Sequence, residues 1–463
     1  MVQCGRIARE KTFGPALTGV DSTNEPDAGP HPSSRAKAGS LKDRCDTQSS
    51  PALDTRATVK SKSAPRYYAL VTVAYWGFTL TDGALRMLVL LHFHRLGYTA
   101  VELSFLFLFY EFFGIVTNLL GGWVAARSGL KVMLYAGFLI QIGALMMLAL
   151  LQPGWPHLTS MIYVMTAQAL SGIAKDLTKT SAKTAIKIMA PDDVDGVLFK
   201  WIARLTGSKN ALKGAGFFMG GALLGLLGFA GSLITMATGL LVVLLATVVA
   251  LPAGMGKAKS KIKFTTLFSK SAAVNRLSAA RLFLFASRDV WFVVGLPVFL
   301  ASTLRWSFWQ VGTFAATWFI GYGFVQAAVP EILRHSGGRQ RVTGDTARLW
   351  AFILAVVPVA IAAALELGLN NAPILMVGLG VLMVVFAVNS AVHSYLLLAY
   401  SSDDEVAVNV GFYYMANAGG RLLGTLLSGA IFEFYGFVGC LMASFVLVSA
   451  AGISSFNLPL PKR

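Results

Sequence analysis

The chain has 463 residues, of which 55% are hydrophobic and only 13% are charged. Soluble domains carry about 25% charged residues, so this composition excludes a water-soluble enzyme. Its three cysteines, Cys4, Cys45 and Cys440, are too few for a disulfide framework or a zinc site. The net charge of +17 would suit a nucleic-acid-binding protein. The positions of the basic residues exclude that partner, because most of them follow the predicted membrane topology.

Residues 1–66 differ from the rest of the chain in composition. They hold 11 Lys/Arg and 7 Asp/Glu, are rich in Pro, Ser, Thr and Gly, and contain no apolar run. Such a segment buries too little apolar surface to offset its ordering entropy, so we predict a disordered N-terminal tail. A cleaved targeting segment is the alternative, although transit peptides are poor in the acidic residues that this segment contains.

From residue 67 onward, apolar stretches alternate with short polar connections. About 20 apolar residues are needed for a helix to cross a bilayer. We count twelve such stretches and predict an all-α membrane protein with twelve transmembrane helices. The predicted helices cover about 68–93, 101–123, 132–152, 158–180, 205–229, 232–253, 276–302, 306–332, 346–368, 373–398, 406–432 and 434–456.

The basic residues gather in alternate connections, which predicts cytoplasmic N- and C-termini. The protein is then a multi-pass component of a plasma or inner membrane, or of an organelle membrane if the tail is a targeting peptide. The longest basic connection, at 254–275, separates six predicted helices at 67–253 from six helices and a short tail at 276–463. Two parallel six-helix halves around a central pathway describe the major facilitator fold.

The connection after the second predicted helix supports this fold. Its sequence from Gly122 to Lys131 resembles the G-x-x-x-D-R-x-G-R-K signature of the major facilitator superfamily, with Ala126 in place of the usual aspartate. We therefore expect Gly122, Arg127, Gly129 and Lys131 to belong to a conformational gate. The missing aspartate leaves the charge partner of Arg127 open.

Ionisable residues at membrane depth are costly and mark functional sites. The sequence places six cations and four anions there, an excess that suits a phosphate or carboxylate group gripped by arginine. We predict a substrate site made by the six cations, and proton-coupling or charge-pairing roles for three of the anions; the fourth anion is Asp176. The six are Arg86, Lys175, Lys213, Arg281, Arg288 and Arg421, and the three are Asp82, Glu111 and Asp289.

Helical spacing predicts how some of these groups pair. Asp82 and Arg86 lie four residues apart on one face, so they can pair with each other. Arg288 and Asp289 are adjacent and should not face each other, so we expect Asp289 to find its partner on another helix. Glu111 is as plausible an interhelical partner as a proton site.

Two other polar patterns favour structural roles. The lysines at 175, 179, 183 and 187 form a ladder that we interpret mostly as a solvated face near anionic headgroups, with Lys175 the deepest. Asn389 and His393 share a face, and a lone histidine there is more often a hydrogen-bonded packing residue. No phosphate-cradling glycine loop or metal-ligand cluster occurs, so we predict a carrier with no catalytic residue, cofactor or metal.

Several long stretches resemble the ArsJ-type organoarsenical efflux permeases, a branch of the major facilitator superfamily. The resemblance covers roughly 67–456 and is strongest in the first seven predicted helices. It is carried by 75–98 (YWGFTLTDGALRMLVLLHFHRLGY), 107–123 (FLFYEFFGIVTNLLGGW), 169–187 (ALSGIAKDLTKTSAKTAIK), 205–218 (LTGSKNALKGAGFF) and 278–302 (SAARLFLFASRDVWFVVGLPVFLAS).

The resemblance implies export of 1-arseno-3-phosphoglycerate, which confers arsenate resistance. Glyceraldehyde-3-phosphate dehydrogenase makes that compound from arsenate, so the enzyme is implied as a functional partner without physical contact. Three alternatives stay open: an organophosphate:phosphate exchanger, a proton-coupled exporter of other small molecules, and a membrane scaffold or sensor that transports nothing.

Overall fold

The computed structural model describes residues 51–128, 130–189, 195–251, 271–335, 342–368, 371–401, 406–456 and 458–460. The chain divides into two units after Arg56, and every site discussed below lies in the second, Ala57–Arg463. Most of the predicted tail at 1–66 lies outside the described residues. Its last part belongs to the first helix, which begins at Pro51, a residue type suited to the first turn of a helix.

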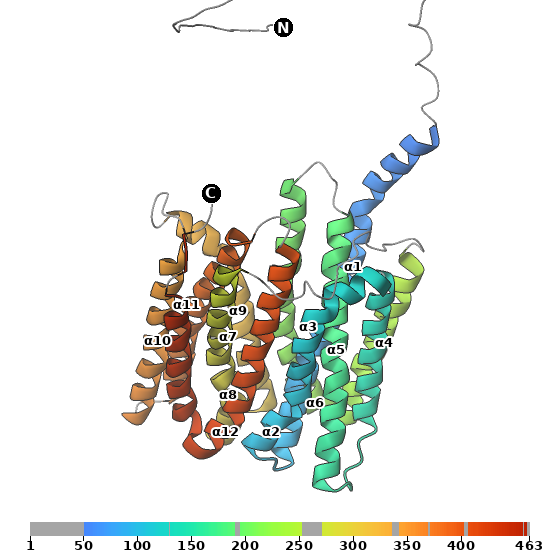
Figure 1. The fold of residues 1–463 in the computed structure, drawn as a ribbon. Helices are drawn as coiled ribbons and strands as arrows, with labels where there is room; N and C mark the ends of the chain where they lie inside the picture. Colours follow the sequence, from blue (N-terminus) through green and yellow to red (C-terminus); the bar gives the residue numbers. More distant parts are fainter. Residues whose placement is uncertain are drawn as a thin grey trace, which may run out of the picture. The chain divides into compact units, whose positions relative to one another are not determined.

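The described residues form helices and no strands (Figure 1). The helices are α1 (Pro51–Arg95), α2 (Ala100–Leu106), α3 (Leu108–Ser128), α4 (Leu130–Ala149), α5 (His157–Met189), α6 (Asp195–Ala250), α7 (Ala272–Phe292), α8 (Gly295–Ser302), α9 (Phe308–His335), α10 (Gly344–Glu366), α11 (Asn371–Ala399) and α12 (Val406–Ser454).

Seven helical segments of the described chain are long and apolar enough to cross a membrane. The prediction of an all-α, multi-pass integral membrane protein is therefore confirmed. Two of these segments, Ser208–Ala250 and Asn409–Ser454, are about twice as long as one crossing requires. Each is interrupted by a glycine with a left-handed backbone, Gly228 at φ 67° and Gly436 at φ 63°. The count of twelve transmembrane helices stays a prediction.

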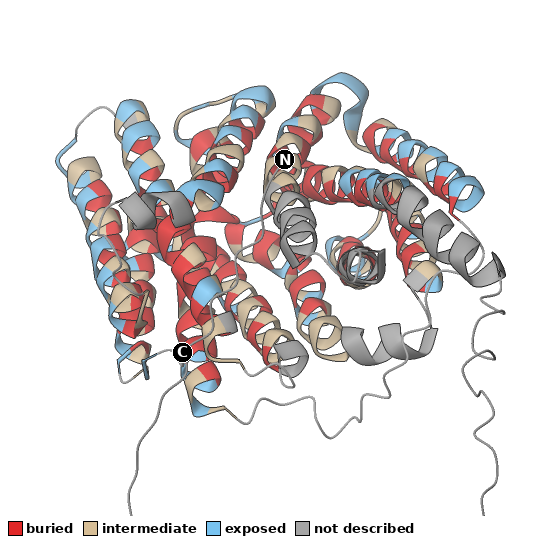
Figure 2. Ribbon diagram, turned by 90° about the horizontal axis from the view of Figure 1, so that it is seen from above, coloured by how far each residue is buried: buried red, intermediate tan, exposed pale blue. Residues whose placement is uncertain are grey.

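The outward faces of the helices are apolar, as a lipid environment requires. Figure 2 shows buried residues turned toward the interior and exposed residues on the outer faces of the bundle. On α6, for example, Leu241, Val242 and Leu245 are 43%, 61% and 56% exposed. An exposed apolar stripe of this kind would be unfavourable in water and is favourable against acyl chains.

Contacts between helices far apart in the chain build the interior. α12 packs against α7, α10, α3 and α2, while α6 packs against α9 and α4. The connection predicted at 254–275 lies almost wholly outside the described residues. The division into bundles at 67–253 and 276–463 therefore stays a prediction, although the labels of α1–α6 and α7–α12 gather on opposite sides of Figure 1.

Close approach of α6 to α1 depends on glycine. A Cβ atom on Gly220 would meet the carbonyl group of Ala84, and one on Gly216 would meet the carbonyl oxygen of Leu80. Small residues allow two backbones to approach closely, which is the main source of packing energy between helices in lipid. This contact brings Asp82 and Arg86 on α1 close to Lys213 on α6.

We predict that Gly220→Ala lowers the stability of the protein by about 1–3 kcal/mol, because the added methyl group overpacks the α1–α6 contact. Gly239→Ala is the matched control, since Gly239 lies on the same helix with open space around its Cβ position. There the change should be neutral or stabilising, because alanine favours a helix over glycine. Midpoints of thermal unfolding in detergent test this, and equal midpoints for the two variants would contradict it.

Candidate functional site

A cavity of about 1290 Å³, counted with its part open to solvent, lies among α1, α3, α5, α6, α7, α9, α11 and α12. Among the described residues that line it, seven are basic and two are acidic. The basic residues are Lys175, Lys179, Lys209, Lys213, Arg281, Arg288 and Arg421, and the acidic residues are Asp82 and Asp176. An excess of positive charge with low-dielectric walls attracts anions.

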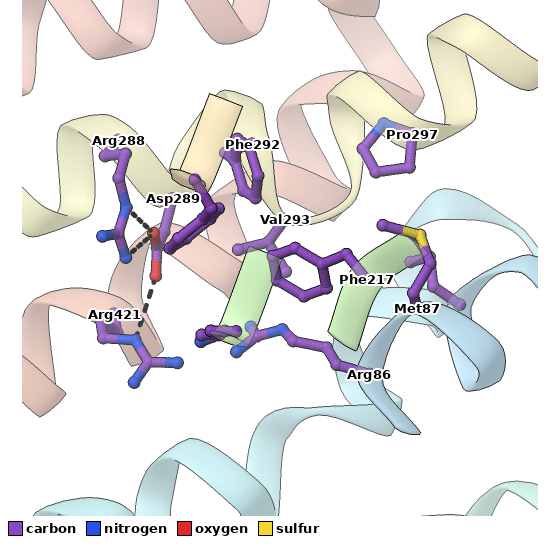
Figure 3. Close-up of a pocket in the computed structure, with 12 residues that line it drawn as sticks. Arg86, Met87, Phe217, Arg288, Asp289, Phe292, Val293, Pro297 and Arg421 are labelled. Atoms are coloured by element: carbon purple, nitrogen blue, oxygen red, sulfur yellow. Dashed lines mark hydrogen bonds and ion pairs between the residues drawn. The ribbon is translucent and has the colours of Figure 1, made fainter. Parts of the chain in front are cut away.

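A second pocket of about 380 Å³ adjoins this cavity and includes Arg86, Met87, Phe217 and Pro297 in its lining (Figure 3). Four residues line both spaces: Lys213, Arg288, Phe319 and Arg421. These side chains therefore form the boundary between the cavity and the smaller pocket, where a ligand passing from one to the other would meet them.

Glu111 on α3 lies at the centre of the charged residues and is fully buried. Its Oε1 atom accepts hydrogen bonds from Arg86 Nη1 of α1 at 2.8 Å and from Arg421 Nη2 of α12 at 2.5 Å. One carboxylate is thus shared by two guanidinium groups from two other helices.

Asp289 on α7 is shared in the same way (Figure 3). Its Oδ1 accepts from Arg288 Nη2 at 2.5 Å, and its Oδ2 accepts from Arg421 Nε at 3.4 Å. Arg421 therefore bridges Glu111 and Asp289, and the ion pairs connect α1, α3, α7 and α12. Because the groups are almost excluded from water, removing one member would leave a costly unpaired charge.

Helical spacing predicts the Asp82 contact wrongly and the Asp289 contacts only in part. Asp82 does not pair with Arg86; it accepts a hydrogen bond from the hydroxyl group of Tyr110 at 2.6 Å, while Arg86 turns to Glu111. A stronger partner on another helix outweighs the weak interaction available four residues along. Arg288 does contact the adjacent Asp289, through Nε at 2.6 Å, because its long side chain folds back along the helix. The expected partner on another helix is also present, as Arg421.

The lysine ladder of α5 faces the cavity more than the sequence predicts. Lys179, assigned to a solvated face, lines the cavity and donates to Asn118 Oδ1 at 2.6 Å and to Asp176 Oδ1 at 3.1 Å. The Nζ atom of Lys175 lies 3.9 Å from the centre of the Tyr110 ring and 4.0 Å from Asp176. The four-residue spacing identifies a shared face but not the direction in which that face points. The side chains at 183 and 187 lie outside the described part.

Lys213 and Arg281 differ from the other deep cations, because neither forms an ion pair with a carboxylate of the described residues. The Nζ atom of Lys213 lies 5.7 Å and 5.5 Å from the ring centres of Phe217 and Phe319. Arg281 Nη1 donates to the carbonyl oxygen and the hydroxyl group of Ser390, at 3.1 Å each, and its buried Nε has no hydrogen-bond partner among the described residues. Both side chains line the cavity, one from α6 and one from α7.

The residues of the predicted gate are only partly described. Gly122 and Arg127 lie near the end of α3, where side chains are outside the described part, and Gly129 itself is outside it. The Nζ atom of Lys131 donates to the carbonyl oxygen of Leu251 at 2.9 Å, which connects the start of α4 to the residue that follows α6.

Helices α2 and α12 are in direct contact. Glu433 Oε2 accepts a hydrogen bond from the backbone N–H of Ala100 at 2.8 Å. Four residues earlier on α12, Gly429 packs against Ala100 and Ser104 so closely that a Cβ atom would overlap them.

Sequence reasoning missed the uncharged lining of the cavity. Phe285, Phe319 and Tyr322 supply aromatic surface, and Gln326 accepts from Asn210 Nδ2 at 3.1 Å between α6 and α9. Aromatic residues are common on membrane helices, so no sequence signal separates these from lipid-facing ones.

Asn389 and His393 are buried with no hydrogen-bond partner among the described residues, unlike the satisfied packing residues expected there. Within the described ranges no three His, Cys, Asp or Glu side chains cluster to hold a metal ion.

Comparison with known proteins identifies the fold. No protein-family description matches the chain, and no curated sequence matches it. Among solved structures, a POT family transporter in complex with a thioalcohol-conjugated peptide is similar at a TM-score of 0.68, with 12% identity over 84% of this chain and 95% of that one. A POT family transporter in complex with 5-aminolevulinic acid is similar at 0.68, with 13% identity and the same coverage. The chain therefore has the fold of these membrane transporters.

Proposed function

We propose that this protein is a transporter of small organic anions and that Lys213 and Arg281 are the first groups to hold the anion. The observation that carries this proposal is that both cations face one cavity without a carboxylate partner in the described chain. A cation in a water-poor site gains most from an anion that enters it when no carboxylate is already paired with it.

In this proposal the anion binds to Arg86, Arg288 and Arg421 after it has bound to Lys213 and Arg281. Each of the first three forms an ion pair with Glu111 or Asp289, so an anion has to compete with a carboxylate for it. Arg288 and Arg421 border both the cavity and the smaller pocket, where they meet an anion as it moves between them. Lys175 completes the set of substrate-binding cations predicted from the sequence.

Transport proceeds by alternating access, in which the same site opens first to one side of the membrane and then to the other. The arrangement supports this mechanism, because Lys213, Arg288 and Arg421 line both the cavity and the smaller pocket that adjoins it. The segment from Gly122 to Lys131, which includes Arg127 and Gly129, serves as a gate, and both termini lie in the cytoplasm.

The substrate that we propose is 1-arseno-3-phosphoglycerate, exported to confer arsenate resistance. This substrate rests on the resemblance to organoarsenical efflux permeases. The cavity is compatible with it, because the molecule is strongly anionic and seven basic side chains line the space. Glyceraldehyde-3-phosphate dehydrogenase supplies the compound and is the functional partner.

Expression of the full chain in arsenate-hypersensitive cells, with and without glyceraldehyde-3-phosphate dehydrogenase, tests the substrate. We expect resistance only when both proteins are present in a host that lacks its own copy of the enzyme. Arg288→Gln and Arg421→Gln variants that reach the membrane should lose this resistance. Normal resistance with both variants would contradict the assignment of these arginines.

An organophosphate:phosphate exchanger is the second candidate, since the same cations recognise any phosphate ester. Liposomes loaded with inorganic phosphate distinguish the two functions. An exchanger takes up 3-phosphoglycerate only when phosphate is present on the other side, whereas an exporter of the arsenic compound does not depend on that phosphate.

A further inference from the structure

The four deep carboxylates differ in what neutralises them. Glu111 and Asp289 are each shared by two arginines, and Asp176 lies beside Lys175 and Lys179. Asp82 forms no ion pair with any described residue, and its one hydrogen bond comes from the uncharged hydroxyl group of Tyr110. A proton on any of the first three would break an ion pair, whereas a proton on Asp82 breaks none among the described residues.

We propose that Asp82 binds a proton when the cavity binds its anion, an inference that rests on the transport function proposed above. Asp82 lines the cavity, so a proton reaches it from cavity water. Tyr110 donates to Oδ1, and Oδ2 has no hydrogen-bond partner among the described residues. The proton binds Oδ2 and gives a neutral carboxylic acid, while the bond from Tyr110 is kept. When the site opens to the other side, the proton returns to water from the same oxygen.

The charged and titratable groups around Asp82 explain why its proton affects the anion. Cations on three other helices act on it electrostatically, as do the phenol groups of Tyr75 and Tyr110. Those cations are also the ones proposed to hold the substrate. The groups are Tyr75 and Arg86 on α1, Tyr110 and Glu111 on α3, Lys175 and Asp176 on α5, Lys213 on α6, and Arg421 on α12.

The sign of the coupling follows from charge. Ionised Asp82 repels an incoming anion and partly compensates Lys213, so protonation of Asp82 strengthens anion binding. By thermodynamic linkage the bound anion strengthens proton binding by the same factor. Because each ligand strengthens binding of the other, the anion and the proton are expected to cross the membrane together in one direction (symport) rather than in opposite directions (antiport).

Binding of 3-phosphoglycerate to the purified full-length protein tests this inference, with wild type and Asp82→Asn compared at each pH between about 4 and 8. The asparagine keeps the size of the side chain and the oxygen that accepts from Tyr110, but it cannot ionise. At the upper end of this pH range, we expect Asp82→Asn to bind 3-phosphoglycerate about tenfold more tightly than wild type does. An approximately tenfold change in affinity is typical of coupling between two binding sites. The two dissociation constants should converge as the pH falls and Asp82 becomes protonated.

Protonation of the ligand itself also changes with pH, but it changes both dissociation constants by the same factor. It therefore cancels in the ratio of the two constants. Asp345→Asn is the matched control, since Asp345 pairs with Arg348 outside the cavity, and its constants should equal those of wild type at every pH. A ratio between Asp82→Asn and wild type that does not change with pH would overturn the role of Asp82. Absence of binding by wild type and Asp82→Asn at every pH would instead refute the proposed transport function, and this inference with it.

Discussion

Lys213→Met and Arg281→Gln are each expected to weaken the binding of 3-phosphoglycerate by about 10- to 100-fold, the cost of losing one charge-assisted hydrogen bond. The loss should be large because neither cation is paired with a carboxylate in the described chain, so each can interact fully with the bound anion. Equilibrium binding to the purified protein in detergent measures the effect, and uptake into liposomes should fall in parallel.

Stability separates this effect from misfolding. Lys213→Met removes a charge that has no acidic partner in the described chain, so its thermal midpoint should equal or exceed that of wild type. Arg348→Gln is the control for loss of positive charge, because Arg348 lies outside the cavity and pairs with Asp345 at 2.9 Å. It should bind the anion as wild type does. Wild-type affinity in both Lys213→Met and Arg281→Gln would refute the proposed substrate site.

Glu111→Gln is expected to lower the stability of the protein by about 3 kcal/mol, the usual result of breaking a buried ion pair from one side. Arg86 and Arg421 both lose the negative charge that they share, and Arg421 keeps an ion pair only with Asp289. The fall in thermal midpoint can be followed with a thiol-reactive dye in a Cys4→Ser, Cys45→Ser background. Cys440, the remaining thiol, is buried until the protein unfolds.

An anionic ligand should partly reverse this loss. With Glu111 neutral, Arg86 and Arg421 are free to bind an anion, so 3-phosphoglycerate should raise the midpoint of Glu111→Gln more than that of wild type. Glu366→Gln is the control, because Glu366 is exposed at the end of α10 and outside the ion pairs. If Glu111→Gln unfolds at the same temperature as Glu366→Gln, the shared carboxylate does not stabilise the fold.

The depth of the charged residues could be read from the sequence, but their partners could not. Depth follows from position within an apolar stretch, so Arg86, Glu111, Asp289 and Arg421 stand out without a structure. Their pairing depends on how far each helix is rotated about its axis and on which helices are neighbours. Arg421 and Glu111 are 310 residues apart in the chain, and no spacing rule acts over such a distance.

Rotation of the helices also explains the misassigned residues. The four-residue spacing of the lysines predicts a mostly solvated face near headgroups for Lys179, whereas the structure turns that face of α5 toward Asn118 on α3. The contrast between Lys213, which lacks an acidic partner in the described chain, and Arg288, which has one, is invisible in the sequence. Both are simply basic residues at similar depth.

The sequence by itself determined that the chain is an all-α membrane protein with an excess of buried positive charge. Hydrophobicity and side-chain charge are local properties, and the bilayer converts them directly into helices and depth. Only the tertiary structure decided that Glu111 and Asp289 are shared by arginines while Asp82, Lys213 and Arg281 have no oppositely charged partner in the described chain. Helix packing in lipid is governed by close contacts such as that of Gly220 with Ala84, and these contacts choose which charges meet.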